Sequence, residues 1–218
     1  MSNENKKQTT ENEIGKIERN KPDDFDYISP AILIDLRFYN GVNFVGKRIE
    51  GYEAEKPLML GKAAEALRQA NESFLKRHYC LKIFDTYRPL RAVEHFIRWG
   101  WEPSDKWSKA KYYPRIEKAD LFKKYIAIRS EHTRGSAVDL TLVSVNGYKE
   151  IDMGSDYLLF DTKSHLDTTE ITREQRDNRK LLHDVMINSD FEPYDYEWWH
   201  FHYKDDPYPD TYFDFPVQ

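Results

Sequence analysis

The segment SEHTRGSAVDLTLV (residues 130–143) places a histidine and an aspartate seven residues apart, across a turn that contains a glycine. The apolar run AVDLTLV (137–143) predicts a strand, and YIAIRS (125–130), on the other side of the turn, predicts another. His132 and Asp139 are therefore either two ligands of one metal ion, or a turn histidine and a polar residue at the start of a strand. Neither residue decides between these alternatives alone.

Helices and further strands are predicted on both sides of this motif. Apolar residues at spacings of three and four predict amphipathic helices within residues 55–79, 89–97 and 171–190. Runs of β-branched and aromatic residues predict strands within residues 31–46, 79–85 and 191–203. Residues 101–120 have no clear period and predict a long surface excursion. Because no regular β-α-β order is present, the expected fold class is α+β, with helices packed on a mainly antiparallel sheet.

A change of composition near Tyr27 indicates where the folded part begins. Residues 1–26 consist mainly of polar and charged residues, which predicts a disordered tail followed by one domain, residues 27–218. The tail is similar to a linker left after removal of a lipoprotein signal. Because the N-terminus lacks the apolar region of a secretory signal, the chain as written is expected in the cytoplasm, and in the periplasm if the tail is such a linker.

Charge and hydropathy exclude several kinds of partner. The net charge of −5 comes from interspersed acids and bases without a basic stripe, so no nucleic-acid partner is expected. No apolar stretch is long enough for a transmembrane segment. The single cysteine, Cys80, cannot form an internal disulfide and is expected to be a buried, inert thiol. A His-Glu-x-x-His motif, a phosphate loop and a Gly-x-Ser-x-Gly elbow are all absent.

A second histidine lies near the end of the chain, in the tetrapeptide EWWH, which contains Glu197 and His200. A hydrolytic zinc site needs three protein ligands, an open position for water, and a nearby carboxylate that takes the proton of that water. In a regular strand, residues three apart point to opposite faces. Both side chains can therefore serve one site only if the backbone bends between them; otherwise they are a glutamate at a strand end and a histidine at an edge.

Arg88, in DTYRP (residues 85–89), follows a predicted strand and precedes a predicted helix. An arginine at such a junction usually pairs with a local carboxylate, here Asp85. It could instead be a fixed cation that stabilises the oxyanion of a tetrahedral intermediate. Together with the two histidine motifs, Arg88 completes a set of metal ligands, general base and oxyanion partner.

Five segments, in this order, resemble the VanX-like D-alanyl-D-alanine dipeptidases, zinc metallopeptidases of the wider D-Ala-D-Ala carboxypeptidase-like group. They are YRP, SEHTRGSAVDLTL, MGS, EWWHF and the terminal DDPYPDTYFDFPV. The resemblance covers residues 34–217 and implies the hedgehog and DD-peptidase type of fold. It also implies that one Zn²⁺ ion is held by His132, Asp139 and His200, with Glu197 as general base and Arg88 as transition-state stabiliser.

The resemblance extends to the substrate site, with two departures. It implies that Ser130 lines this site and that Asp85 orients Arg88. Phe38 stands where the family usually has a tyrosine, and Leu158 where it usually has an aspartate; in the relatives that pair helps to grip the free ammonium of the dipeptide. Asp156, two residues from Leu158, is expected to substitute for the missing carboxylate if the loop shifts.

The expected activity is zinc-dependent hydrolysis of D-alanyl-D-alanine or related D,D-dipeptides. One alternative is a DD-carboxypeptidase or endopeptidase that acts on longer peptidoglycan stem peptides, for which Phe38 and Leu158 would be an advantage. Another is a zinc-binding interaction domain without activity, like the hedgehog signalling domains, and a third is a metal-free structural domain. Glu197 and Arg88 argue against a domain without activity. His165 and His202 are candidates for supporting groups outside the metal ligands.

Overall fold

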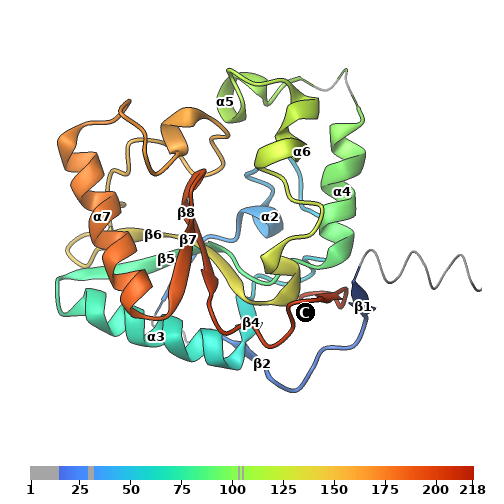
Figure 1. Ribbon diagram of the computed structural model, residues 1–218, viewed down its shortest axis with the longest axis horizontal. Coiled ribbons are helices and arrows are strands. Elements are labelled where there is room, and N and C mark those ends of the chain that lie inside the picture. Colours follow the sequence, from blue (N-terminus) through green and yellow to red (C-terminus); the bar gives the residue numbers. More distant parts are fainter. Residues whose placement is uncertain (1–14, 29–31, 103, 105) are drawn as a thin grey trace, which may run out of the picture.

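The computed structural model describes residues 15–28, 32–102, 104 and 106–218, and a five-stranded sheet lies at its centre (Figure 1). The strands stand in the order β3 (Leu33–Ile34), β5 (Tyr79–Asp85), β6 (Ala137–Ser144), β8 (Glu197–Tyr203) and β7 (Phe191–Tyr194). The β3–β5 pair is parallel and the other neighbouring pairs are antiparallel. The α+β class with a mainly antiparallel sheet is therefore confirmed.

The central strand β6 is the apolar run with which the motif of residues 130–143 ends. Its residues 137–143 are all buried, as expected for a strand covered on both faces. Asp139 lies within this run and is 2% exposed. A buried carboxylate requires positive charge or hydrogen-bond donors close by, so the surroundings of Asp139 have to supply them.

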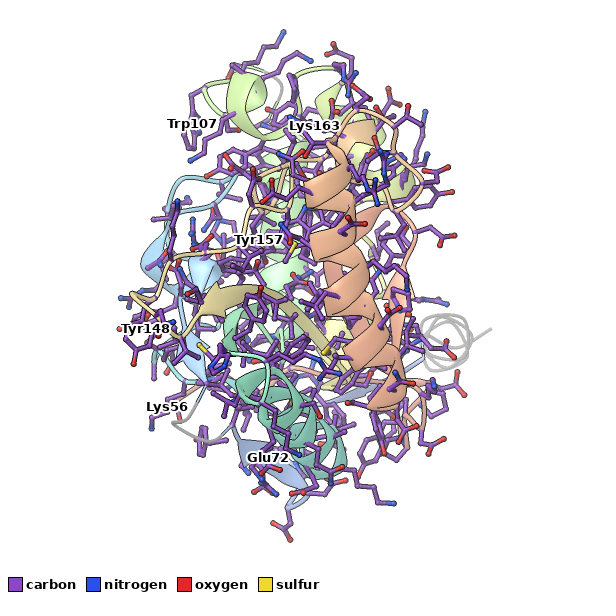
Figure 2. All side chains as sticks on the ribbon, turned by 90° about the vertical axis from the view of Figure 1, so that its left-hand side faces the viewer. Lys56, Glu72, Trp107, Tyr148, Tyr157 and Lys163 are labelled. Carbon is purple, nitrogen blue, oxygen red and sulfur yellow. The ribbon has the colours of Figure 1, made fainter. Side chains whose placement is uncertain are left out.

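Two long helices lie together on one side of the sheet. The helix α3 (Gly61–Leu75) packs against β5 and against α7 (Arg173–Asn188), which also packs against β7. The helix α7 begins at a capping box, in which Thr172 and Gln175 each accept a hydrogen bond from the other's backbone N–H. Figure 2 shows α7 along this side of the molecule, with α3 below it. Both helices agree with the apolar spacings in the sequence.

The remaining helices and strands are short, apart from α4 (Leu90–Gly100), which starts directly after Pro89. Two small sheets pair β1 (Lys16–Glu18) with β9 (Thr211–Phe213), and β2 (Phe25–Tyr27) with β4 (Leu58–Leu60). The short helices are α2 (Arg37–Asn40), α5 (Lys109–Tyr112), η1 (Lys118–Asp120), α6 (Leu121–Lys124), η2 (Glu131–Arg134) and η3 (Thr162–Ser164). None of the helices described is long and apolar enough to cross a membrane.

Strand pairing and core packing extend upstream of residue 27, the predicted start of the folded domain. Strand β1 pairs in parallel with β9, and Phe25 is 2% exposed, with its ring edge-on to those of Tyr87, Phe213 and Phe215. Strand pairing uses backbone groups, so a polar stretch can form it, and a single phenylalanine is enough to hold the segment to the core. The first fourteen residues of the predicted tail lie outside the described residues.

Two strand predictions also need correction. Residues 125–130 form no strand; the backbone N–H groups of Tyr125 and Ile126 both bond to the carbonyl of Leu121, and the chain then leaves α6 as an irregular segment. Residues 191–203 form a hairpin of two strands, β7 and β8, where the sequence predicted a single strand. Aromatic and β-branched residues fit either arrangement, because a pattern of side chains does not show where a two-residue turn falls.

Candidate active site

Three neighbouring strands bring the predicted site residues into one row across the sheet. Asp85 of β5 is the register partner of Asp139 in β6, and Asp139 is also the partner of His200 in β8. His132 comes from η2, the short helix just before β6. Residues that are far apart in sequence are therefore adjacent because their strands are hydrogen-bonded neighbours.

The turn between η2 and β6 depends on Gly135. Its φ of +77° lies in the left-handed region, and a Cβ atom there would stand 2.3 Å from the ring of Phe25. Any other residue would face both backbone strain and a steric clash. The N-terminal end of η2 is held by Ser130, whose hydroxyl accepts a hydrogen bond of 3.3 Å from the backbone N–H of His132. The position of His132 is thus set at both ends of the helix.

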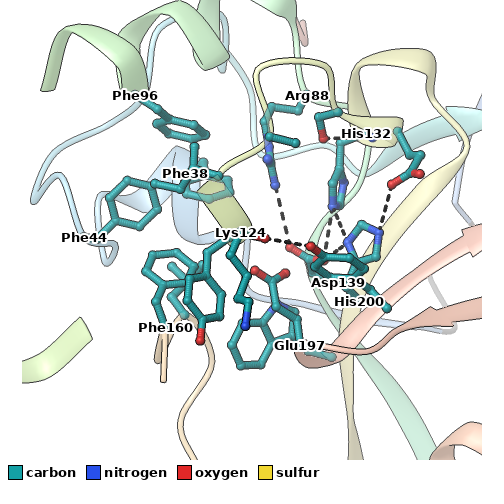
Figure 3. A pocket seen from close by; sticks show the side chains of 18 of the residues that line it. Phe38, Phe44, Arg88, Phe96, Lys124, His132, Asp139, Phe160, Glu197 and His200 are labelled. Carbon is teal, nitrogen blue, oxygen red and sulfur yellow. Dashed lines mark hydrogen bonds and ion pairs between the residues drawn. The ribbon is translucent and has the colours of Figure 1, made fainter. Parts of the chain in front are cut away.

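Strand β8 has the bend that Glu197 and His200 require to serve the same site. Pro193 of β7 pairs with Phe201, but the next residue, Tyr194, pairs with Glu197. One step along β7 thus corresponds to four residues of β8, and the extra residues turn the chain between the two side chains. Glu197 and His200 consequently line the same cavity (Figure 3).

His132, Asp139 and His200 form an almost equilateral triangle of ligand atoms. His132 Nε2, Asp139 Oδ1 and His200 Nδ1 are each 3.1 Å from the other two (Figure 3). In a tetrahedral zinc site with bonds of ~2.0–2.1 Å, ligand atoms stand about 3.3–3.4 Å apart. The triangle is therefore close to the spacing that a single zinc ion needs.

Each imidazole has an inner nitrogen, which belongs to the triangle, and an outer nitrogen, which points away from it. The contacts of the outer nitrogens show where the ring hydrogens lie. His132 Nδ1 is 2.7 Å from the carbonyl oxygen of Thr86, which can only accept, so Nδ1 carries the hydrogen. His200 Nε2 faces the carboxylate of Glu131 at 3.5 Å. With hydrogens on these outer nitrogens, the two inner nitrogens and the carboxylate oxygen turn three lone pairs toward one another. Such a group needs a positive charge at its centre, either a proton or a metal ion.

The electrostatics of the cluster favour a cation at the same place. Burial opposes ionisation of Asp139, yet His132 and His200 hold its pKa far below the usual value. Burial also opposes charge on His200, but the carboxylates of Asp139 and Glu131 raise the pKa of His200 to about 10. Two nitrogen donors and one oxygen donor are the set that hydrolytic zinc sites use. The residues present therefore fit a zinc ion.

Glu197 is a buried carboxyl group with an unused hydrogen-bonding atom. It is 7% exposed, and its Oε1 has no hydrogen-bond partner among the described residues. Burial, and next the negative charge of Asp139, raise the pKa of Glu197 to about 8. A carboxyl group of this kind in a cavity is suited to accepting and returning a proton near neutral pH.

Arg88 is fixed from several sides. Its Nε and Nη2 donate to Asp85 Oδ2 at 3.0 and 2.9 Å, and Asp85 Oδ1 accepts from the hydroxyl of Tyr52 at 2.7 Å. The guanidinium also lies over the rings of Phe38 and Phe96, 5.0 and 5.4 Å from their centroids. Arg88 is therefore a pre-positioned cation beside the triangle, with Nη2 at 3.7 Å from Asp139 Oδ2.

These groups line one cavity of about 200 Å³. Phe38, Phe44, Phe96 and Phe160 gather at the end away from His132 and His200 (Figure 3). Pockets for drug-sized molecules usually measure ~300–1,000 Å³, so this cavity suits a small substrate or one end of a chain.

The sequence also matches a family of known enzymes. A family model described as D-ala-D-ala dipeptidase matches residues 18–218. The chain belongs to this dipeptidase family. It is 39% identical over 194 residues to the D-alanyl-D-alanine dipeptidase of Enterococcus faecium, and 41% identical over 193 residues to that of Enterococcus faecalis; each match covers 88% of this chain and 96% of the relative. The protein is therefore a peptidase of the dipeptidase type.

Two solved structures show a more distant likeness. The vancomycin resistance D,D-pentapeptidase VanY, in complex with Zn(II), has a TM-score of 0.41 and 15% identity, over 72% of this chain and 78% of that chain. The LD-carboxypeptidase LdcB has a TM-score of 0.43 and 17% identity, over 85% of this chain and 71% of that chain.

The cavity of this dipeptidase brings together most of the predicted site residues, but Asp156 lies outside it. Arg88, Ser130, Glu197 and the three atoms of the triangle line it or lie next to it, whereas Asp156 is exposed and lines a separate depression. The reason is local: Tyr157 turns inward to donate to Asp139 Oδ2 at 2.8 Å, and Leu158, with a φ of +65°, brings its side chain into the cavity. The structure thus places Asp156 outside the cavity, and a role for it in substrate binding stays a prediction.

Several contacts of the dipeptidase site have no signal in the sequence. Tyr157 and Tyr52 each donate a hydroxyl hydrogen bond to a site carboxylate, 18 and 33 residues away in sequence. No spacing rule links residues so far apart. Of the two additional histidines considered, His165 contacts the hydroxyl of Tyr125, and His202 pairs with Glu192 at 3.3 Å; neither lines the cavity.

Proposed function

We propose that the protein hydrolyses D-alanyl-D-alanine or closely related D,D-dipeptides, using one zinc ion held by His132, Asp139 and His200. The observation that carries this proposal is the triangle of three ligand atoms, each 3.1 Å from the others, in a cavity that also holds Glu197 and Arg88. The dipeptidases of the two Enterococcus relatives support the choice of substrate.

In this proposal each side chain has a distinct task. Zinc, when bound, supplies Lewis acidity that makes water a nucleophile near neutral pH. Glu197 accepts the proton of the attacking water at its carboxylate and then delivers it to the leaving amine. Arg88, held by Asp85 and two aromatic rings, donates N–H groups to the oxygen that becomes negative in the tetrahedral intermediate. Ser130 lines the cavity and offers a hydroxyl to the substrate.

The proposal is tested by measuring alanine release from D-alanyl-D-alanine, its N-acetylated form and a stem pentapeptide. Each substrate is assayed with protein loaded with zinc and with protein treated with a chelator. We expect release from the free dipeptide by the zinc-loaded protein alone, with recovery after zinc is returned. Equal rates before and after chelation would contradict the role of zinc, and release from none of the substrates would contradict the peptidase specificity.

One observation favours a second candidate, hydrolysis of peptides whose amino group is blocked or extended. Among the described residues that line the cavity, the carboxylates are those of Glu131, Asp139 and Glu197. Glu131 faces His200, Asp139 belongs to the triangle, and Glu197 is the proposed base. None is left for a substrate ammonium, and the far end of the cavity is formed by phenylalanines.

A second cavity beside this one offers room for the rest of a longer peptide. Lys124, Tyr125 and Phe160 line both this cavity and a neighbouring one, which continues toward Arg115. The two cavities therefore adjoin along these three side chains. Faster release of alanine from the pentapeptide than from the free dipeptide would favour this second candidate.

Restoring a polar pair at the far end should improve turnover of the free dipeptide. Leu158 has a φ of +65°, which aspartate adopts more readily than leucine, so Leu158→Asp also relieves backbone strain. Combined with Phe38→Tyr, it should raise kcat/KM for D-alanyl-D-alanine about 10-fold, because a hydrogen bond to a charged group is worth ~1.5–3 kcal/mol. Leu158→Asn with Phe38→Tyr is the matched control, since it lacks the negative charge. An equal gain in both variants would show that charge pairing with the ammonium is not the cause.

A further inference from the structure

A group of ionisable side chains lies on the outer side of His200 and has no task in the proposed reaction. Glu131 Oε2 is 3.5 Å from His200 Nε2, the nitrogen that faces away from the triangle. Atoms of Glu131, His200 and His202 capable of binding a metal lie within 4.8 Å of one another. The group could be a second metal site, or Glu131 could act on the proposed zinc ligand His200.

The chemistry of His200 decides between these two arrangements. Its Nδ1 is already part of the triangle, so a second ion at Nε2 would require an imidazole that has lost both ring hydrogens. A carboxylate at Nε2 requires only the ordinary N–H, which it accepts. In addition, His202 Nε2 faces Glu192 Oε2 at 3.3 Å, so His202 has a partner of its own. The contact between Glu131 and His200 is therefore better explained by hydrogen bonding than by a shared ion.

We propose that Glu131 is a positioning residue, which holds the ring of His200 and selects the tautomer whose Nδ1 is free to bind zinc. The proposal rests on the proposed function, in that it takes His200 as a zinc ligand. Carboxylates that accept the outer N–H of a metal-bound histidine fix the ring and make the inner nitrogen a stronger donor.

The position of Glu131 in the chain fits this task. It is the first residue of η2 and the direct neighbour of His132. The same helix therefore supplies one proposed ligand and orients another from a different strand. The backbone carbonyl of Glu131 accepts a hydrogen bond of 3.3 Å from the hydroxyl of Ser136, and the carboxylate of Glu131 is 3.9 Å from Arg134. These two contacts hold Glu131 at the end of the site.

The test is the zinc affinity of Glu131→Ala, measured by competition with a chelator of known affinity. We expect zinc to bind ~10–100-fold more weakly, the usual effect of losing such an outer carboxylate, with one zinc ion per chain in both proteins. Glu131→Gln retains an acceptor oxygen without the charge, so its zinc affinity should lie between those of the wild type and Glu131→Ala. Glu192→Ala is the matched control: it removes the carboxylate that faces His202 and should leave zinc affinity unchanged.

Melting temperatures of the metal-free proteins show whether each variant folds as the wild type does. Unchanged zinc affinity in Glu131→Ala would overturn the proposal. So would a second zinc ion per wild-type chain that is lost in Glu131→Ala and in His202→Ala, because Glu131 would then be a metal ligand. If the wild type bound no zinc, the proposed function itself would fail. Zinc binding by the wild type that is indifferent to Glu131 would overturn the positioning role alone.

Discussion

Replacement of Glu197 by glutamine is expected to lower kcat by ~10²–10⁴-fold, because general base assistance contributes about this much, and to leave binding of the proposed zinc ion unchanged. Glutamine has nearly the same shape but cannot accept the proton of the attacking water. Glu197 Oε1 is buried and has no hydrogen-bond partner in the part of the chain that the structure describes, so the substitution breaks no hydrogen bond seen there at that atom. The measurement is kcat at saturating dipeptide, together with zinc content per chain. Near-normal turnover, or loss of zinc, would contradict the assigned role.

The same variant should be more stable than the wild type when both are free of metal. Burial and Asp139 raise the pKa of Glu197 from its ordinary 4.5 to about 8. Below pH ~4.5 the carboxyl is neutral in both folded and unfolded states; as pH rises toward 8, only the unfolded state ionises readily, so stability falls. At pH 7, glutamine should recover about 2–3 kcal/mol, since one pKa unit is worth ~1.4 kcal/mol.

Differential scanning calorimetry on the metal-free proteins measures this gain. A change of this size should raise the melting temperature by roughly 5–10 °C in a protein of this length, and the gain should shrink below pH 5. Glu192→Gln is the control, because Glu192 has a side chain that is 55% exposed and should show no such shift. A melting temperature for Glu197→Gln below that of the wild type would contradict the explanation. A gain in stability with a loss of activity indicates a carboxyl group kept for its chemistry.

The parts of the site that were predictable from sequence belong to short motifs. His132 and Asp139 lie in one continuous segment, and Glu197 and His200 in another, so each pair could be recognised without knowledge of the fold. The need for a bend between Glu197 and His200 also followed from strand geometry, and the shifted register of β7 against β8 provides it.

The contacts that could not be predicted depend on how distant segments pack. Tyr157 reaches Asp139 only because the loop after β6 folds back over the sheet, and this same turn carries Asp156 away from the cavity. Residues 125–130 have the composition of a strand but follow α6 as an irregular segment that lines the cavity. Local propensity is overridden at such places, because tertiary contacts decide the backbone.

Replacement of His132 by alanine is expected to abolish both zinc binding and zinc-dependent hydrolysis. It removes one of three proposed ligand atoms, so the loss of zinc affinity should exceed the ~10–100-fold that an outer carboxylate costs. Zinc at 100 times its dissociation constant stabilises a protein by ~2.7 kcal/mol, which raises the melting temperature of the wild type. In His132→Ala this zinc-dependent rise should disappear, and alanine release should equal that of the chelator-treated wild type.

His202→Ala is the matched control for this experiment. His202 lies on the same strand as His200 and near it, but its Nε2 pairs with Glu192 and it is not part of the triangle. It should therefore keep the zinc-dependent rise in melting temperature and the activity. Comparison of the metal-free variants separates the loss of a ligand from a general loss of packing, because His132 is 2% exposed and its removal also opens a small cavity. If zinc still raised the melting temperature of His132→Ala but not that of His202→Ala, the ion would lie on the outer side of His200. The triangle would then not be the metal site.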